Sequence, residues 1–432
     1  MAGRARRRGG RLRRRIGSSL PIVLATLVLA SCLDRPASRR LHDEIGRIRA
    51  AGEPLTFEEL RAGQSAGDGA DGAPDYRAAI ALLTGLDSQP LFHLLNAYRA
   101  GTKSHPPVPP SPELRERARR MLAQAQPALE LIDQAARKGA CYYAFNLENG
   151  DLPSFGVFRT ASILLSLRTL EFSFAGEADR AAASLISSFR MLRVFDTEPV
   201  LIAYLVRLAE WAQACADLPA VLSAGALSET SLGALDEALQ LAEAPDLLKR
   251  TIEGERVWGM NQWAASLGPD WPDGEVRSAS AKRRPFWRRP RLVREASDYL
   301  AATTAVINAA SVPWPQVLDT MPTCPARTSL DSVACELPME RAGQTLAATR
   351  AGRVAIGVER YRRRQGELPA SLTDLASPLP ADPFTGHDLL YQRAEDRFVV
   401  ASIGPARTTD ARAVDEKGRP QGISVCFTRP GR

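Results

Sequence analysis

The chain has 432 residues, of which 45% are hydrophobic and 24% are charged, and its formal net charge is +7. Eight arginines lie within the first 15 residues, so the rest of the chain is close to neutral, with a formal charge of −1. This distribution argues against nucleic-acid binding, which needs a basic surface on the folded part of a protein. The length is sufficient for a large core and favours about two or three domains.

The N-terminal segment has the successive parts of an export signal. The arginine-rich start is followed by an apolar stretch, residues 16–30, which is shorter than the roughly 20 apolar residues of a transmembrane helix. The stretch ends in Leu29, Ala30, Ser31 and Cys32. Small residues directly before a cysteine at the end of such a segment indicate a processing site.

This arrangement resembles the lipobox of bacterial lipoproteins, in which the cysteine receives a diacylglycerol and becomes the first residue of the mature chain. The resemblance implies that Cys32 is lipidated and that its acyl chains anchor the protein in a membrane. Leu33 stands where an aspartate would favour the inner membrane, so the resemblance implies the periplasmic face of the outer membrane. An ordinary secretory signal with a chance cysteine is the alternative.

The other five cysteines are compatible with an oxidising compartment. Cys324 and Cys335 lie in one proline-containing, loop-like stretch and are the candidate disulfide pair, with two unpaired thiols as the alternative. Cys215 lies on an apolar helical stripe and is predicted to be buried. The chain has no C-x-x-C spacing and its four histidines are scattered, so we expect no metal site and no cofactor.

Residues 32–110 are predicted to form a tether with short helices. Leu41, Ile45 and Ile48 recur at helical spacing, and Thr56 with Glu59 forms a candidate capping box. We expect further helical pieces between residues 75 and 95, broken near Pro90.

A formal G-x-S-x-G sequence surrounds Ser65 within a run of small residues. A nucleophile elbow needs a buried strand before the serine and a helix after it. Neither pattern is present here, so the match is interpreted as accidental.

Residues 111–340 are predicted to form a helical array. Ser111 is the expected N-cap of a long helix that Pro127 kinks or interrupts, and the next helix, residues 157–174, is apolar on two sides and therefore buried. Gly176 separates it from a helix over residues 178–192, and this pair resembles one tetratricopeptide helical hairpin. Further helices are expected over residues 200–218, 229–242 behind a Ser228 cap, 247–267 and 292–310.

Two charged stretches in this region invite a functional interpretation. Glu253 and Glu255 suggest acid–base chemistry, but residues two apart on a helix do not face each other, so surface ion pairs with Lys249 or Arg256 are expected instead. The basic, aromatic stretch at residues 282–291 is predicted to be a solvated loop, with contact to anionic lipid headgroups as the alternative.

The C-terminal segment combines a helix, turn residues and two short strands. Gly366 is expected to end the helix in a left-handed conformation, Ser371 and Asp374 to cap a short turn, and residues 389–393 and 397–403 to pair as a hairpin. In this order the segment resembles the soluble end of the major pseudopilin of type II secretion, over about 60 residues.

The preceding helix departs from the pseudopilin pattern, because it carries Arg341, Arg350 and Arg353 in place of an apolar stem, so a filament subunit is not expected. In the pseudopilin family the C-terminal loop can bind calcium through acidic and carbonyl oxygens. The acidic residues in the corresponding stretch of this chain do not have a spacing that aligns residue by residue with that motif. These acidic residues are Asp410, Asp415 and Glu416.

Together these patterns predict a mainly α fold: an irregular multi-helix array with a small C-terminal module of a helix plus an antiparallel β-hairpin. The predicted ranges are 1–31 for the signal peptide, 32–110 for the tether and short helices, 111–340 for the array and 341–432 for the pseudopilin-like module. The predicted function is a non-enzymatic, lipid-anchored envelope protein that is a scaffold or interaction surface for an envelope protein partner. An accessory component of a secretion or pilus-like system and an envelope hydrolase are the alternatives.

Overall fold

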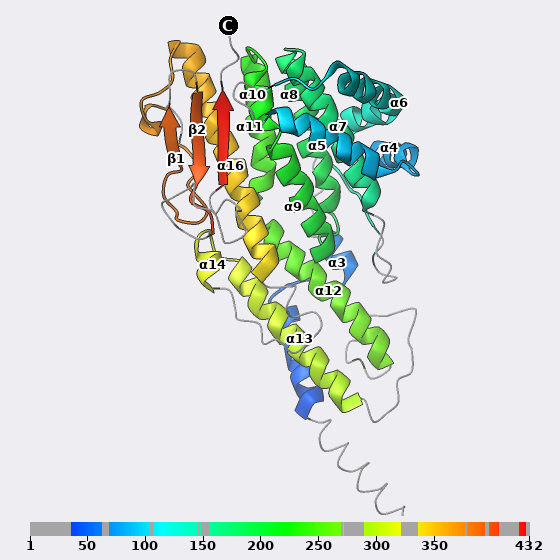
Figure 1. Cartoon of the computed structure of the whole chain (residues 1–432). Helices are drawn as coiled ribbons and strands as arrows, with labels where there is room; N and C mark the ends of the chain where they lie inside the picture. The colour runs from blue at the N-terminus through cyan, green and yellow to red at the C-terminus, as the bar shows by residue number, and fades with distance from the viewer. Residues whose placement is uncertain are drawn as a thin grey trace, which may run out of the picture. The chain divides into compact units, whose positions relative to one another are not determined.

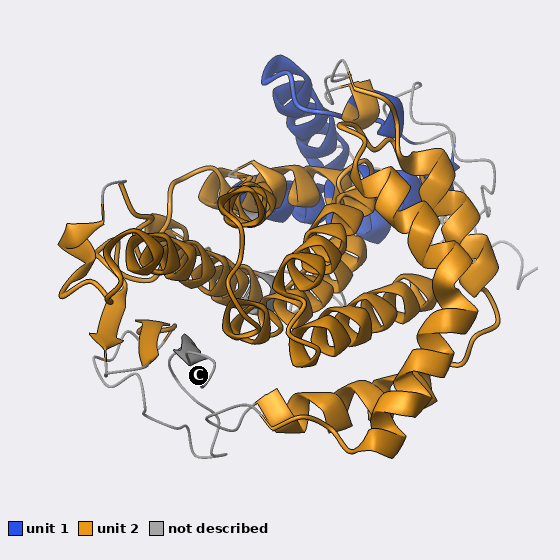
Figure 2. Ribbon diagram, turned by 90° about the horizontal axis from the view of Figure 1, so that it is seen from above, with its two compact units in different colours: residues 1–59, 148–151, 256–305 blue, residues 60–147, 152–255, 306–432 orange. Residues whose placement is uncertain are grey.

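The structure is a computed structural model that describes residues 36–62, 69–102, 108–145, 147, 155–244, 246–268, 271, 289–320, 336–375, 378–393, 397–405 and 423–428. It is mainly helical with an antiparallel sheet near the C-terminus, which confirms the predicted fold class (Figure 1). The chain divides into two compact units (Figure 2). Unit 1 comprises residues 1–59, 148–151 and 256–305, and unit 2 comprises residues 60–147, 152–255 and 306–432.

Unit 1 has its own apolar core. Residues 36–50 are helical, and Leu41, Ile45 and Ile48 are buried, as their spacing predicted. They pack with apolar residues from the C-terminal part of α12 (Leu247–Leu267) and the N-terminal part of α13 (Arg289–Ala310). These partners are Met260, Ala264, Leu267, Val293, Ala296, Tyr299 and Leu300.

The capping box predicted at the start of α3 (Phe57–Ala62) is present. The backbone N–H of Glu59 donates to Thr56 Oγ1 at 3.1 Å, and the backbone N–H of Thr56 donates to Glu59 Oε2 at 3.3 Å. These two bonds satisfy backbone donors that the first turn of a helix leaves unpaired.

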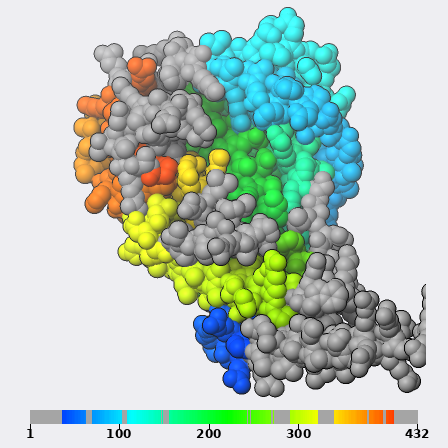
Figure 3. Space-filling view, turned by 60° about the horizontal axis from the view of Figure 1, so that its bottom comes forward, coloured from blue at the N-terminus to red at the C-terminus, as the bar shows by residue number. Residues whose placement is uncertain are grey.

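Unit 2 is arranged around α7 (Gly156–Phe174), which is buried on nearly all sides, as its two apolar stripes predicted. It contacts six other helices: the three α-helices that directly precede it in the described sequence and the three that directly follow it. These helices are α4 (Ala73–Leu83), α5 (Ser88–Thr102), α6 (Pro112–Ala136), α8 (Ala178–Met191), α9 (Leu201–Cys215) and α10 (Leu218–Ser223). The exposed faces of α4 and α5 belong to one continuous surface (Figure 3, blue to cyan).

The predicted helix boundaries of unit 2 are largely confirmed. Ser111 Oγ accepts from the N–H of Leu114 at the start of α6, Ser228 caps α11 (Glu229–Gln240), and Gly176 has the positive φ of +76° that ends α7. One detail differs from the prediction: the break expected near Pro90 lies at residues 84–87. Helix α6 runs through Pro127 without interruption, so of the two predicted effects of this proline the kink stays a prediction. Pro90 itself is in the first turn of α5, where its missing N–H removes no helical hydrogen bond.

The C-terminal part of unit 2 contains α14 (Gln316–Thr320), α16 (Glu336–Gln365), the 3-10 turn η6 (Leu372–Asp374) and a three-stranded sheet. Its strands are β1 (Leu390–Arg393), β2 (Arg397–Ser402) and β3 (Ile423–Thr428), in the order β1-β2-β3 with both pairs antiparallel. Leu390 opposes Ala401, and Phe398 opposes Phe427. The sequence predicted the hairpin of β1 and β2 but not the third strand.

Helix α16 connects this sheet to the helices of the array. It contacts β2 and β3 (Figure 1) as well as α9 and α11. Arg353 on α16 pairs with Asp236 at 2.8 Å and with Glu243 at 2.6 Å, and Arg350 pairs with Glu243 at 3.3 Å. Two of the three arginines that distinguish this helix from a pseudopilin stem, Arg350 and Arg353, therefore bind carboxylates of the array. Gly366, with φ +80°, and the capping box of Ser371 with Asp374 follow as predicted.

The compact units are composed differently from the predicted domain ranges. Residues 73–102 were grouped with the tether, but they form α4 and α5, which contact α7 inside unit 2 because their buried apolar residues pack there. Residues 37–55 share a core with residues 260–300 instead. The domain boundaries stay a prediction.

Within the described ranges, no single helix has the length and apolar character of a membrane span. Helices α4 and α5 reach that composition only as a pair, with a bend of 100° between them.

Candidate functional site

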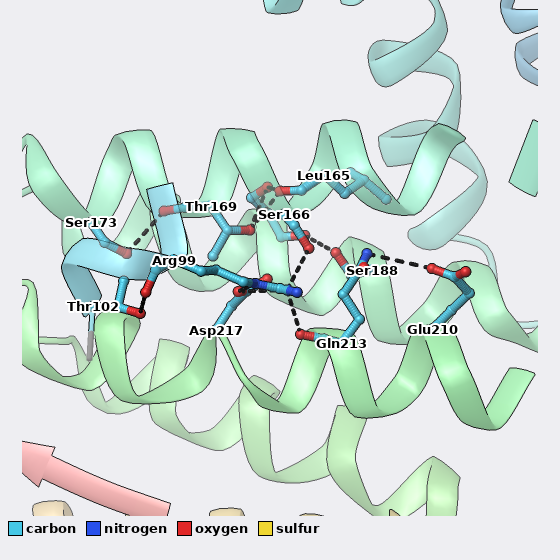
Figure 4. A network of polar contacts seen from close by, with 11 residues as sticks. Arg99, Thr102, Leu165, Ser166, Thr169, Ser173, Ser188, Glu210, Gln213 and Asp217 are labelled. Carbon is cyan, nitrogen blue, oxygen red and sulfur yellow. Dashed lines mark hydrogen bonds and ion pairs between the residues drawn. The ribbon is translucent and has the colours of Figure 1, made fainter. Parts of the chain in front are cut away.

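The interior of unit 2 contains a network of charged and polar side chains along α7 (Figure 4). Arg99 of α5 donates to Asp217 Oδ1 from Nε at 3.0 Å and from Nη2 at 2.8 Å. The same Nη2 donates to the carbonyl of Gln213 at 2.8 Å and to Ser166 Oγ of α7 at 3.4 Å. One guanidinium thus joins α5, α7, the end of α9 and the residue that precedes α10.

Glu171 of α7 is the centre of a second cluster of contacts. It accepts from Arg115 Nη2 and from Arg119 Nε, each at 2.8 Å, and both arginines lie on α6. The hydroxyl of Tyr98 on α5 donates to the same carboxylate at 3.2 Å, and this carboxylate together with burial raises the pKa of Tyr98. Glu171 therefore holds two neighbouring helices against α7.

Arg168 of α7 is the centre of a third cluster of contacts, in which it makes a bidentate ion pair with Asp133 of α6. Its Nη1 and Nη2 donate to the two oxygens of Asp133 at 2.9 and 2.7 Å, and its Nε donates to Ser184 Oγ of α8 at 2.9 Å. Such parallel N–H···O bonds fix the relative orientation of both groups. In all three sets a charged side chain is paired with an opposite charge inside the protein, which indicates a structural role.

Breaking one of these buried pairs should destabilise unit 2. We expect Arg168→Met to lower the free energy of unfolding by about 2 kcal/mol, because the partly buried Asp133 carboxylate loses its charged partner and keeps only the hydrogen bond from Ser187. Arg120→Met is the matched control, since Arg120 forms an exposed ion pair with Glu116 and should change stability by less than about 0.5 kcal/mol. Denaturant unfolding of both variants tests this. Equal effects would show that the Arg168 pair has no special role.

Glu210 of α9 is a buried carboxyl group with a strongly shifted pKa. Burial raises its pKa to about 7, although a hydrogen bond from Ser162 and the charges of Arg159 and Arg99 act in the opposite direction. Glu210 is only 7% exposed, so little water solvates its charged form. Glu210 therefore changes charge near neutral pH.

This shift predicts a pH-dependent stability. Because the folded state binds the proton of Glu210 more tightly than the unfolded state, the contribution is fully present below pH 4.5 and is lost as the pH rises to about 7. Relative to Glu210→Gln, the native protein should lose about 3 kcal/mol of unfolding free energy across this window. Denaturant unfolding of both proteins at pH 4.5 and pH 8 measures the difference. A pH-independent difference would contradict the shift.

Most of the residues singled out from the sequence lie outside the described residues, so their predicted roles stay predictions. They are the lipidation candidate Cys32, the disulfide candidates Cys324 and Cys335, Ser65, the acidic residues Asp410, Asp415 and Glu416, and residues 282–288 of the basic stretch. Residues 289–291, which were predicted to belong to the loop, are instead the first residues of α13. Of the cysteines that are described with side chains, Cys141 and Cys215 are both unpaired, and Cys215 is buried as expected. No three potential metal ligands come together in the described part of the chain.

Glu253 and Glu255 do not form a catalytic pair in the structure. Glu253 pairs with Lys249 at 3.3 Å, as predicted, whereas Glu255 Oε2 accepts from the backbone N–H of Leu201 at 3.0 Å. The second contact places a carboxylate at the start of α9, where the helix dipole favours negative charge. Glu253 is buried and Glu255 is partly buried, so the expected surface position was wrong. The reason is that α12 is packed on more than one side.

Arg256, the other expected partner, lies in unit 1. There its Nη1 pairs with Glu53 at 2.7 Å, and the arginine side chain is fully buried.

The best candidate for a binding site in unit 2 is an apolar pocket of about 190 Å³. Its walls come from α9, the start of α12, the end of α13 with the following loop, and α16. Its apolar lining consists of Tyr204, Leu208, Ala244, Leu247, Leu248, Ala310, Val312, Pro313, Trp314, Ala342 and Leu346. Val312, Trp314 and Leu346 are only half-buried, so this lining continues to the surface.

The charged groups that line this pocket are neutralised by contacts within the protein. Arg207 pairs with Asp196 at 3.0 Å and lies over the ring of Trp211, with its guanidinium 4.9 Å from the ring centre. Arg350, besides its ion pair with Glu243, donates to the carbonyl of Ala381 at 2.7 Å. The pocket therefore offers mainly apolar surface to a ligand.

The sequence analysis missed this pocket. Its residues come from four segments between positions 204 and 350, and each segment reads as ordinary core when taken alone. A half-buried tryptophan next to the end of α13 was the one local signal.

Comparison with known proteins adds no functional assignment: no family model matches the chain, and no curated protein or solved structure is significantly similar to it.

Proposed function

We propose that this protein is a lipid-anchored envelope protein whose helical array is a binding scaffold for another envelope protein. The apolar pocket of unit 2 accepts an aromatic or branched aliphatic side chain of that partner. A single apolar side chain seated in a desolvated pocket is the usual anchor of a protein interface.

The size and lining of the pocket are the observations that carry this proposal. A cavity of about 150 Å³ lined by apolar side chains is sufficient to bind benzene. The 190 Å³ pocket is large enough for one ring or one branched side chain, and the charged lining residues Arg207, Glu243 and Arg350 have partners already. An apolar group can therefore enter without leaving a charge unpaired.

The location of the protein is proposed from the leader. The arginine-rich start, the short apolar stretch and Cys32 support export followed by lipidation. An anchored scaffold has its partner in the same compartment, so the proposed partner is an envelope protein and no nucleic acid is involved.

A role as an accessory of a secretion or pilus-like system is the second candidate. This second role is favoured by the C-terminal module. In the module the 30-residue helix α16 is followed by a capped turn and then by an antiparallel sheet, which contacts α16. A hydrolase is less well supported, since Glu253 and Glu255 have structural contacts and Ser65 remains only a sequence match.

Lipidation predicts a specific mass for the mature protein. We expect the protein purified from envelopes to begin at Cys32 and to exceed the polypeptide mass by a diacylglycerol, with or without a further acyl chain. Cys32→Ala should lack this addition and should retain the leader. Intact-mass spectrometry of both proteins tests the prediction, and an unmodified full-length chain in the cytosol would refute the proposed location.

The pocket predicts where a partner binds. A photo-crosslinking amino acid at position 312 should yield one defined crosslinked protein in living cells, because Val312 is at the open end of the pocket. Leu346→Asp should abolish this product, since it places a charge in the apolar lining.

Leu82 supplies the matched control for this experiment. It is an exposed apolar residue of α4, 57% accessible, and it does not line the pocket. The same photo-crosslinking residue at position 82 should not give the product, and Leu82→Asp should leave crosslinking from position 312 unchanged. A product that survives Leu346→Asp would exclude the pocket as the binding site.

A further inference from the structure

A second pocket of unit 2, of about 240 Å³, differs from the apolar one in its charge. It lies where α6 ends and is also lined by residues from the end of α8 and from α11. Four of its lining residues are cationic and one is acidic. They are Arg137, Lys138, Arg190, Arg193 and Glu237. The two pockets have no lining residue in common.

The backbone that carries two of these cations is fixed by hydrogen bonds to another segment. Ala140 forms a parallel bridge with Asp71, and the N–H of Gly72 donates to the carbonyl of Ala140 at 2.9 Å. Asp71 Oδ1 also accepts from the N–H of Tyr142 at 2.9 Å. Residues 137–142 therefore form a defined wall of the pocket.

Two further arginines, Arg190 at the end of α8 and Arg193 in the 3-10 turn η2 (Leu192–Phe195), are held in place by backbone carbonyls at this wall. Arg190 Nη1 donates to the carbonyl of Ala136 at 3.2 Å, and Arg193 Nη1 donates to the carbonyl of Gly139 at 2.9 Å. A guanidinium has five N–H donors. Each arginine therefore keeps N–H groups and its full charge for a ligand.

The negative charges near the pocket do not cancel the four positive ones. Glu237 contributes one negative charge, and Asp75, which pairs with Lys138 at 2.5 Å, contributes a second one. The C-terminal ends of α6 and α8 each add roughly half a negative charge. Asp196, which is near Arg193, is already paired with Arg207 at 3.0 Å, and Asp133, which is near Tyr76, is paired with Arg168 at 2.7 Å. The charges of Asp71 and Arg77, which both act on Cys141, offset each other. The four cations, the two carboxylates and the two helix ends therefore sum to a net charge of about +1 at the pocket.

The remaining wall of the pocket is uncharged. Burial raises the pKa of the Cys141 thiol to about 12 and raises the pKa of the Tyr76 hydroxyl as well. Both groups are therefore neutral at physiological pH, and neither opposes an anion.

We propose that this pocket binds a phosphate-bearing ligand, with the anion between Arg137, Arg190 and Arg193. Guanidinium groups match the paired oxygens of a phosphate, and the enclosed volume accommodates a phosphate together with a small attached group. The ligand is either a free phosphorylated compound or the headgroup of an anionic phospholipid, because both present the same group.

Titration calorimetry of the full-length protein in detergent tests this proposal. The probes are inorganic phosphate, glycerol 3-phosphate and short-chain dihexanoyl phosphatidylglycerol, with dihexanoyl phosphatidylcholine as the zwitterionic comparison. We expect at least one anionic probe to bind at millimolar concentration or below, more weakly at high salt. The tightest probe distinguishes a free phosphate from a lipid headgroup.

Two substitutions should change the affinity in opposite directions. Arg137→Gln should weaken binding about fivefold, and Glu237→Gln should tighten it about threefold, because they remove an attractive and a repulsive charge. Both residues are exposed, so both variants should fold. A double variant, Arg190→Gln with Arg193→Gln, should weaken binding by more than about tenfold.

Arg117→Gln is the matched control for Arg137→Gln. Arg117 is an exposed arginine of α6 that does not line the pocket, and its loss changes the net charge of the protein by the same amount. It should leave the affinity unchanged. The proposal is overturned if no anionic probe binds, if Arg117→Gln weakens binding as much as Arg137→Gln, or if Glu237→Gln fails to tighten it.

Discussion

Guanidinium–carboxylate pairs around α7, each with one buried member, are the interaction on which unit 2 depends. Arg168 binds Asp133, Glu171 binds two arginines of α6, and Arg99 binds Asp217 beside Ser166. Charges withdrawn from water are tolerated only when they are paired and hydrogen-bonded, so each pair permits essentially one arrangement of the helices that carry it. The pairs therefore specify which helix packs where, whereas the apolar residues of α7 supply most of the driving force for burial.

The elements of this fold could be predicted from local patterns, but their partners could not. The two apolar stripes of α7, the Ser111 and Ser228 caps and the glycine at 176 are each visible within a few residues. The ion pairs join residues 35 to 118 positions apart, and no local pattern encodes such a distance. The third strand was missed for the same reason, because β3 is separated from its partner β2 by 20 residues. Glu255 looked like a surface residue because its burial depends on a neighbouring helix.

The same limit applies to the candidate sites. Both pockets of unit 2 form where helix ends from distant segments meet, and each uses residues that are unremarkable in sequence. Their chemistry differs: one pocket has an apolar lining whose charges are already paired, and the other has four cations around neutral walls. A scaffold with these two surfaces suits a protein that holds a partner through an apolar contact and an anion through charge. The leader, which lies outside the described residues, supplies the proposed location.

The central structural claim is that α7 and its ion pairs form a preorganised frame for both pockets. Hydrogen exchange of the full-length protein, followed peptide by peptide, measures this most directly. The account predicts that peptides covering residues 156–174 exchange most slowly in unit 2 and only when the whole unit unfolds. Exchange of α7 as rapid as that of α4 or of the β1–β2 hairpin would contradict it, because a frame cannot open before the elements that it holds.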